Sequence, residues 1–272
     1  MIGALIIVFR EVIEAGLIIG IVMAATQTVL GSRVWIMGGV LAGIVGSCIL
    51  AAFTGTLASF FDGFGQEIFN AAILAIAVCM LTWHNIWMAL NGRAMAGELK
   101  QAGIAVREGQ KSLLALAIIV GTAVLREGSE VVLFMYGVAI GGRETAGGMA
   151  LGGSIGLIIG AAVSYLTFRG LLKIPNRYFF SVTSWLITFL AAGMAAQSIS
   201  FLEKAGVVEM LQTTVWNSSG LLEESSILGK VLHALIGYSD QPSALQLIVY
   251  VAVLAISFGL TKWISRPKLA TA

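Results

Sequence analysis

Charge is scarce in this chain. Only 11% of its 272 residues are charged and 58% are hydrophobic, whereas soluble domains are about 25% charged. This composition excludes an ordinary soluble domain and predicts an all-α polytopic membrane protein whose surroundings are the lipid bilayer. The formal net charge of +2 is too small to favour binding to nucleic acid.

Cysteine and histidine are also scarce, with two residues of each. Cys48 and Cys79 lie in apolar stretches and form no CxxC pair, which argues against a disulfide framework or a thiolate metal site. We expect both to be small buried apolar side chains. The methionines do not recur as MxxM within a helix, which disfavours a copper pathway.

Long apolar runs make up most of the remaining sequence. Seven of them can cross about 30 Å of hydrocarbon at about 1.5 Å per residue. They cover approximately 2–26, 34–58, 68–91, 113–141, 148–171, 178–201 and 246–264. We therefore expect residues 1–272 to form a single domain of seven transmembrane helices, with its termini on opposite sides of a plasma membrane.

The connections between these runs predict the orientation, because Lys and Arg concentrate in cytoplasmic loops. With the N-terminus outside, eleven basic residues fall inside: Arg33, Arg93, Lys100, Arg107, Lys111, Arg169, Lys173, Arg177, Lys262, Arg266 and Lys268. Only Arg143, Lys204 and Lys230 fall outside. The C-terminus is therefore expected inside.

Acidic loop residues lie mostly on the expected outer side. Glu67, Glu223 and Glu224 are candidates for capturing a cation there, and Asp62, Glu144 and Asp240 share that side. The alternative is that these acids are ordinary solvated charges in loops. The preference of acidic residues for the first turn of a helix also explains Glu67. Within the outer loop 203–245, an apolar stripe in "ILGKVLHALIGY" predicts an interfacial amphipathic helix.

Four further acids lie inside apolar runs, in two copies of one pattern. "REVIE" contains Arg10, Glu11 and Glu14, and "REGSE" repeats it at Arg126, Glu127 and Glu130. Residues three and four apart share a helix face, so each face presents carboxylates beside a guanidinium. A charge at the bilayer centre costs about 2.5–3.5 kcal/mol. These side chains are therefore expected to face one another or water.

The helices around the two motifs also repeat. Small residues recur every fourth position in the second run, at Gly39, Gly43, Ser47, Ala51 and Gly55, and in the fifth, at Gly148, Gly152, Gly156 and Gly160. Such faces allow close helix packing. Three spans followed by three similar spans predict an inverted repeat of about 1–91 and 113–202, with the site at the repeat interface and a seventh helix outside it.

Four converging carboxylates suit a hard cation. The two arginines leave two net negative charges on the cluster. The residue types alone leave open a metal cation or a proton, including a proton-coupled transporter or channel for another divalent cation such as manganese. An intramembrane enzyme is disfavoured. The only aspartates, Asp62 and Asp240, lie in loops, and neither His84 nor His233 follows a Glu by three residues.

Two RExxE motifs in the first and fourth spans resemble those of the iron permease family, which includes fungal ferric permeases and bacterial permeases of elemental-iron uptake systems. "LTWHNIWM" at 81–88, "FLEKAG" at 201–206 and "GYSDQPSALQLIVYV" at 237–251 extend the resemblance over nearly the whole chain. It implies import of ferric or newly oxidised ferrous iron as substrate, with no permanently bound cofactor. The implied ligands are Glu11, Glu14, Glu127 and Glu130, and Arg10 and Arg126 would set their charge and orientation.

The resemblance also carries expectations about partners and about one departure. Family members work with a multicopper oxidase, or with a periplasmic iron-binding protein and a haem peroxidase, and the chain resembles the bacterial inner-membrane members. The family motif usually reads REGxE, but Val12 stands where the second copy has Gly128. We expect the first helix to lie farther from its neighbour there. His84 is a candidate relay ligand on the exit side, or else a hydrogen-bonded interfacial histidine.

Overall fold

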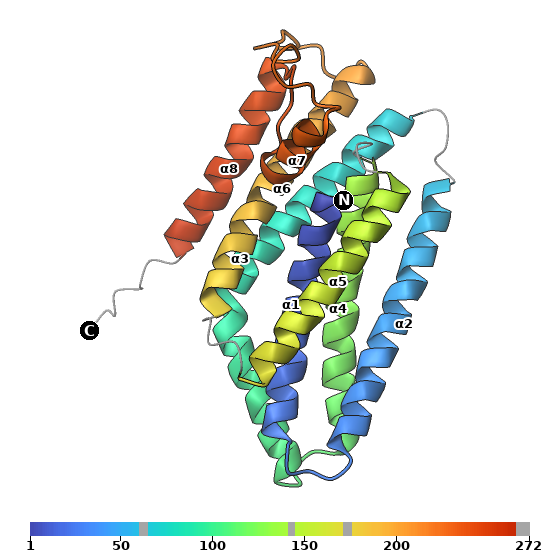
Figure 1. The fold of residues 1–272 in the computed structure, drawn as a ribbon, viewed down its shortest axis with the longest axis vertical. Helices are drawn as coiled ribbons and strands as arrows, with labels where there is room; N and C mark the ends of the chain where they lie inside the picture. The colour runs from blue at the N-terminus through green and yellow to red at the C-terminus, as the bar shows by residue number, and fades with distance from the viewer. Residues whose placement is uncertain (60–64, 141–144, 171–175, 265–272) are drawn as a thin grey trace, which may run out of the picture. The chain divides into compact units, whose positions relative to one another are not determined.

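The chain is all-helical in its computed structural model, which describes residues 1–59, 65–140, 145–170 and 176–264. Eight helices occur in these ranges (Figure 1): α1 (Ile2–Ala25), α2 (Ser32–Ser59), α3 (Gln66–Arg107), α4 (Leu113–Ile140), α5 (Ala146–Phe168), α6 (Asn176–Lys204), α7 (Ile227–Ile236) and α8 (Ala244–Ile264). Each expected span coincides with a helix. Four basic residues that helped to predict the orientation, Arg143, Lys173, Arg266 and Lys268, lie outside the described residues, as do Asp62 and Glu144.

Among the described residues, four helical segments are long and apolar enough to cross a membrane: Ser32–Thr54, Gln66–Met88, Ala146–Phe168 and Val182–Lys204. Ala244–Leu260 forms a shorter apolar helix. α1 and α4 have 24 and 28 residues, which is also sufficient length. They differ from the four because each carries the three charged side chains of its RExxE motif.

α3 is longer than the sequence predicted. We expected its apolar run to end near residue 91, but the helix continues to Arg107 and has 42 residues. Residues 92–107 contain no proline, so the helix can continue through them. They also contain no long apolar run, so this part of the helix is expected outside the hydrocarbon. A Cβ on Gly103 would lie 2.5 Å from the Cβ of Ala25, so this extension packs closely against the end of α1.

The chain forms two compact units. Unit 1 comprises Met1–Phe64, Arg93–Ala139 and Glu144–Ser181, and unit 2 comprises Gly65–Gly92, Ile140–Arg143 and Val182–Ala272. Unit 1 therefore contains the first two helices of each expected repeat, α1 with α2 and α4 with α5. Unit 2 contains most of the third helix of each, α6 from Val182 onward and α3 as far as Gly92, together with α7 and α8.

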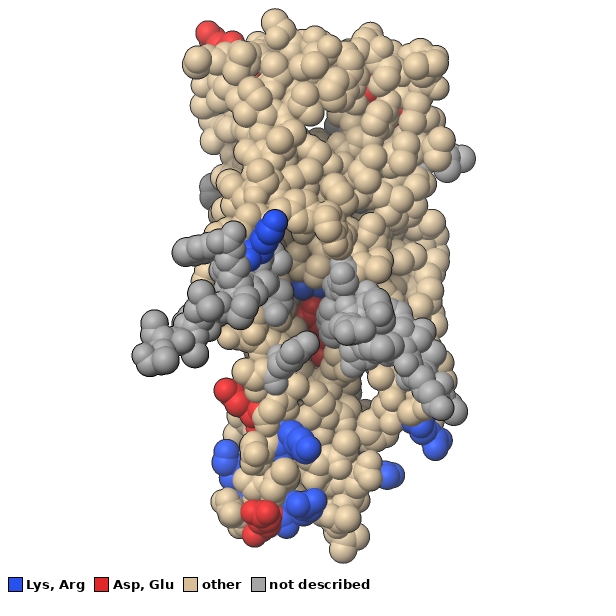
Figure 2. All heavy atoms as spheres, turned by 90° about the vertical axis from the view of Figure 1, so that its left-hand side faces the viewer, with Lys and Arg blue, Asp and Glu red and all other residues tan. Residues whose placement is uncertain are grey.

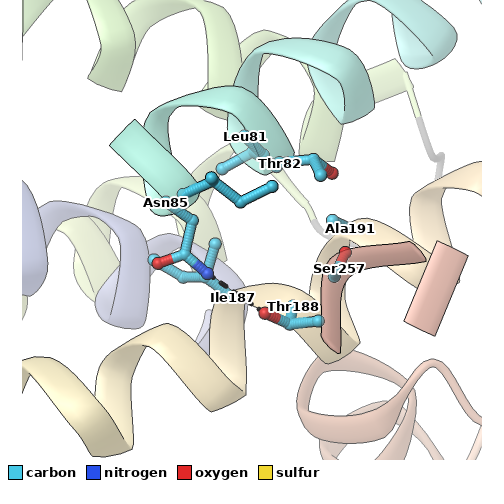
Figure 3. Close-up of a pocket in the computed structure, with 8 residues that line it drawn as sticks. Leu81, Thr82, Asn85, Ile187, Thr188, Ala191 and Ser257 are labelled. Atoms are coloured by element: carbon cyan, nitrogen blue, oxygen red, sulfur yellow. Dashed lines mark hydrogen bonds between the residues drawn. The ribbon is translucent and has the colours of Figure 1, made fainter. Parts of the chain in front are cut away.

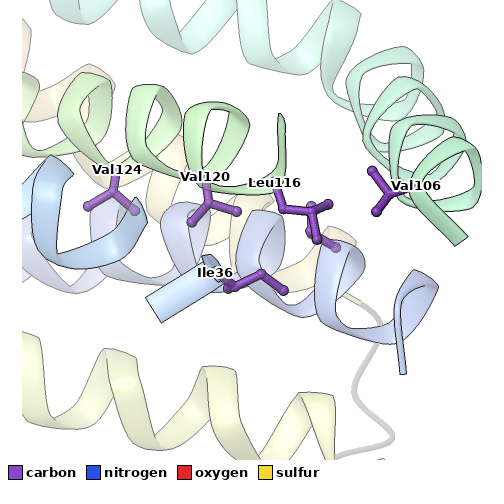
Figure 4. Close-up of a cluster of buried hydrophobic side chains, with 6 residues drawn as sticks. Ile36, Val106, Leu116, Val120 and Val124 are labelled. Atoms are coloured by element: carbon purple, nitrogen blue, oxygen red, sulfur yellow. The ribbon is translucent and has the colours of Figure 1, made fainter. Parts of the chain in front are cut away.

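The core of unit 1 is an aliphatic cluster beside the α4 motif. Leu116, Val120 and Val124 lie one turn apart on α4 and are buried. They pack against Ile36 of α2 and Val106 of α3 (Figure 4), and Val22 of α1 completes the cluster. Burying these side chains fixes α4 against its neighbours and so helps to position the motif that follows Val124.

Polar contacts link the helices of unit 2 in addition to its buried hydrophobic side chains, which include Leu74, Leu81 and Ile187. The side-chain amide of Asn85 donates to the Ser184 carbonyl at 3.2 Å and to the Thr188 hydroxyl at 3.1 Å, which links α3 to α6 (Figure 3). A hollow of about 10 Å³, room for one water molecule, lies beside this contact. The Ser198 hydroxyl links the same two helices by donating to the Ala71 carbonyl at 2.7 Å.

The segment between α6 and α8 is folded around its own hydrogen bonds. Its expected amphipathic helix is α7, with Ser226 as N-cap and Gly237 at φ 68° as C-cap. Glu203, from the quoted "FLEKAG", accepts hydrogen bonds from Ser243 at 2.6 Å and Gln246 at 2.7 Å. These contacts place a carboxylate at the start of α8, where the helix dipole stabilises negative charge.

The expectation that Cys48 and Cys79 are buried is wrong, because both are exposed on α2 and α3. Large apolar side chains on the same helices are exposed as well, including Val45, Ile49 and Ile76. An apolar run in a membrane protein has no need to face inward, since lipid accepts it equally well.

Candidate metal site

The α1 motif is closed to solvent. The side chains of Arg10, Glu11 and Glu14 are 2%, 1% and 0% exposed. The guanidinium of Arg10 reaches both acids, with Nε 2.8 Å from Glu14 Oε1 and Nη1 3.3 Å from Glu11 Oε1. One arginine on α1 thus holds two carboxylates on one helix face, as the spacing predicts.

The α4 motif has the same pairing with a looser geometry. Arg126 Nε lies 3.4 Å from Glu130 Oε1 and 3.5 Å from Glu127 Oε1. The two acids are buried, but the Arg126 side chain is 37% exposed. The sequence predicted equivalent arginines, whereas the structure places one inside unit 1 and the other at its surface.

Acids of the two motifs converge within unit 1. Glu11, Glu127 and Glu130 each offer a carboxylate oxygen, and these oxygens lie within 4.8 Å of one another. Glu14 interacts electrostatically with Glu127. We call Glu11, Glu14, Glu127 and Glu130 the carboxylate cluster. Two oxygens bound to one hard cation at about 2.0–2.6 Å lie at most about 4–5 Å apart, so separations within 4.8 Å are compatible with a shared ion.

Glu127 receives little stabilisation from the groups around it, since its ion pair with Arg126 is long at 3.5 Å. It is 2% exposed, and neither oxygen accepts a hydrogen bond from an amide, guanidinium or alcohol group of the described residues. Burying a charged acceptor without such bonds is costly. Like charges on Glu14 and Glu130 act on the same carboxylate. A bound cation would offset both costs.

Glycine faces bring the neighbouring helices close to both motif helices. On α5, a Cβ at Gly152 would lie 2.0 Å from the Met1 carbonyl oxygen, and one at Gly156 would lie 2.6 Å from that of Leu5. On α2, a Cβ at Gly39 would lie 2.5 Å from the Ala117 carbonyl oxygen. α1 therefore packs on α5 as α4 packs on α2 (Figure 1), and the small-residue stripes serve packing as expected.

Val12 does not disturb this packing, because a glycine faces it. A Cβ on Gly160 of α5 would lie 3.0 Å from the Cβ of Val12, and one on Gly128 of α4 would lie 2.1 Å from the Ser47 hydroxyl oxygen on α2. Each of the two helix contacts thus pairs one glycine with one larger residue. In the contact of α1 with α5 the motif helix carries the larger residue, and in the contact of α4 with α2 it carries the glycine. Comparing the two stripes in the sequence would have aligned Ser47 with Gly160 and revealed this exchange.

The remaining candidates lie in unit 2. Glu67 is exposed in the first turn of α3, and Glu223 is exposed before α7. Glu224 is partly buried and lies 3.4 Å from both His233 Nδ1 and the Ser239 hydroxyl. Among the described residues, none of these three acids belongs to a group of three or more that could hold a metal. His84 is buried in α3.

The two arginines should differ in their tolerance of lysine. We expect Arg10→Lys to lower transport about tenfold or more, because lysine cannot hold two carboxylates in one planar fork and Arg10 is buried between them. Arg126→Lys should cost less, since Arg126 is 37% exposed and its contacts are longer. Uptake assays on both variants at matched expression check this order. Equal effects would make both arginines simple counter-charges.

Comparisons with known proteins identify the family of the chain. The sequence profile of the Iron permease FTR1 family matches residues 1–262. The "Ferrous iron permease EfeU" of Escherichia coli O6:H1 is 31% identical over 247 residues, covering 90% of this chain and 89% of that protein. The proteins of that name from Yersinia pestis and Yersinia pseudotuberculosis are each 30% identical over 249 residues, covering 90% of this chain and 87% and 86% of theirs. No solved structure matches the chain.

Proposed function

Because this chain belongs to the iron permease FTR1 family, we propose that it imports iron across the bacterial plasma membrane through the carboxylate cluster. Membership makes it a multi-pass membrane transporter and not an enzyme. The observation that carries the proposal is the convergence of Glu11, Glu127 and Glu130 from two helices onto oxygens within 4.8 Å of one another. Buried carboxylates at that spacing attract and coordinate a hard cation.

The proposed architecture is an inverted repeat of seven spans with the N-terminus outside. Its support is the packing within unit 1, where α1 on α5 mirrors α4 on α2. In addition, corresponding helices of the two halves fall in the same unit. A cluster built from one helix of each half would lie at the repeat interface, where transporters of this design hold their substrates.

The proposed path begins at the outer acids. Glu67 and Glu223 are exposed and free to meet a cation, and Glu224 contributes to the fold of the outer segment as well. Iron then enters the carboxylate cluster and leaves inward, with His84 as a relay toward the exit. A periplasmic iron-binding protein with a haem peroxidase, or a multicopper oxidase, would deliver the ion.

The oxidation state needs a direct test. The resemblance noted in the sequence implied ferric or newly oxidised ferrous iron, whereas the names of the bacterial relatives specify ferrous iron. Carboxylates bind both ions, but ferrous iron carries a charge that the two net negative charges of the cluster neutralise. Ferrous iron is therefore the form we propose to be coordinated in the cluster.

Uptake of radiolabelled iron into proteoliposomes containing only this chain tests the proposal. We expect uptake of ferrous iron that ascorbate keeps reduced. Unlabelled manganese should compete less strongly than unlabelled iron, and the uptake rate should change when a pH gradient is imposed. Protein-free liposomes are the control. Preferred uptake of manganese would replace iron as substrate, and absence of uptake of any metal would contradict transport by the chain alone.

A further inference from the structure

A hollow of about 350 Å³ lies in unit 1 away from the carboxylate cluster. It is formed where α1 ends, α2 begins and α5 ends, and it is lined by Met23, Gln27, Ser32, Arg33, Ile36 and Phe168. Its volume falls within the range of about 300–1,000 Å³ that ligand pockets occupy. None of its lining residues has a part in the iron path described above.

The lining combines a hydrocarbon wall with a cationic rim. Met23, Ile36 and Phe168 contribute apolar side chains from three helices. Arg33 and Gln27 are exposed, and neither forms an ion pair or side-chain hydrogen bond with any described residue. Ser32 instead donates to the Thr26 carbonyl at 3.1 Å and so fixes the turn between α1 and α2. An uncommitted guanidinium beside an apolar wall suits a ligand that is both anionic and hydrophobic.

The surroundings match the boundary between hydrocarbon and water. Lys and Arg side chains, with acidic ones among them, gather in the lower part of the view in Figure 2, at the end where α1 ends and α2 begins. Beyond Arg33, α2 exposes a continuous apolar face whose members include Val34, Trp35, Met37 and Leu41. Exposed tryptophan next to basic residues is typical of a membrane interface. Lipid packed against α2 would therefore have its headgroup at the level of the hollow.

We propose that this hollow binds one anionic phospholipid. Its phosphate pairs with Arg33 and accepts a hydrogen bond from Gln27, and an acyl chain covers Met23 and Phe168. Basic pockets between transmembrane helices bind anionic headgroups in this way. A free phosphate ion would gain nothing from the apolar wall, and a metal cation would be repelled by Arg33.

Lipid titration of the delipidated full-length protein, followed by native mass spectrometry, tests the site. We expect one phosphatidylglycerol to bind about fivefold more tightly than phosphatidylcholine, the effect of one basic residue near an anionic headgroup. Arg33→Gln should abolish that preference. Arg107→Gln removes an equally exposed arginine outside the hollow and should retain it. A preference that survives in Arg33→Gln, or is lost equally in both variants, overturns the proposal.

A second variant separates a lipid from a free anion. Met23→Trp fills the apolar side of the hollow without changing charge, so it should weaken phosphatidylglycerol binding while Arg33 remains in place. Inorganic phosphate at millimolar concentration should not displace the lipid. Unchanged lipid binding by Met23→Trp, or full displacement by phosphate, would identify a plain anion site and overturn the lipid proposal. Retained iron uptake shows that the variants are folded.

Discussion

Glu127→Gln should reduce iron uptake at least about 100-fold while leaving the protein as stable as the wild type. Even indirect partners of a metal site contribute about 10–100-fold to affinity, and a ligand contributes more. Stability should hold because the contact of Glu127 with the partly exposed Arg126 is long at 3.5 Å, while the charges of Glu14 and Glu130 repel that of Glu127. Removing its charge therefore relieves repulsion.

Glu14→Gln and Glu130→Gln should also abolish uptake, but with different effects on stability. Glu14 pairs with buried Arg10 at 2.8 Å. Its loss leaves the buried Arg10 with only the longer contact to Glu11 at 3.3 Å, so the cost should approach that of breaking a buried pair, about 3–5 kcal/mol. Glu130 pairs with exposed Arg126 at 3.4 Å, so its loss should cost less. Thermal unfolding in detergent checks this order.

Glu98→Gln is the matched control for these variants, because Glu98 is an exposed acid on the extension of α3. It should transport iron normally. Normal uptake by Glu14→Gln or Glu130→Gln would contradict transport through the carboxylate cluster. An equal loss of iron uptake in Glu98→Gln would show that the effect comes from the overall charge of the protein and not from the carboxylate cluster.

Gly39→Leu should abolish transport by separating α2 from α4. A Cβ at this position would lie 2.5 Å from the Ala117 carbonyl oxygen and 3.0 Å from its Cα. Both are backbone atoms, so no side-chain rotation relieves the overlap, and a helix must move. Displacing α4 would move Glu127 and Glu130 away from Glu11 and open a cluster whose oxygens lie within 4.8 Å.

Gly38→Leu provides the control on the same helix. Nothing lies within 4 Å of a Cβ at Gly38, so leucine there should face lipid without consequence. Uptake and iron binding should fall below detection in Gly39→Leu and remain at the wild-type level in Gly38→Leu. Equal activity of the two variants would show that close packing of α2 on α4 is not needed for the site.

Much of the fold was predictable because the chain has little besides apolar runs. Helix bounds followed from run length, and the acids of the site followed from the cost of charge in lipid. The extension of α3 was missed because nothing in residues 92–107 distinguishes a polar helix from a loop. Burial of the cysteines was wrong because hydrophobicity does not tell a lipid-facing position from a core position.

The motifs predicted which residues meet but not how tightly each is held. "REVIE" and "REGSE" are equivalent as patterns, yet Arg10 is buried and Arg126 is 37% exposed. Exposure depends on which helices cover each motif, and that is a tertiary property. Val12 faces Gly160 on α5, whereas Gly128 faces Ser47 on α2. Predicting these two pairs likewise requires knowing which helices pack together.

Iron binding to the purified wild-type protein and Glu127→Gln tests the central claim most directly. X-ray absorption at the iron edge gives both the bound amount and the ligand atoms. We predict one iron per wild-type chain, with oxygen as the predominant ligand and no sulfur, and loss of that iron in Glu127→Gln. Equal binding of iron by the variant in the same environment would contradict coordination by the carboxylate cluster.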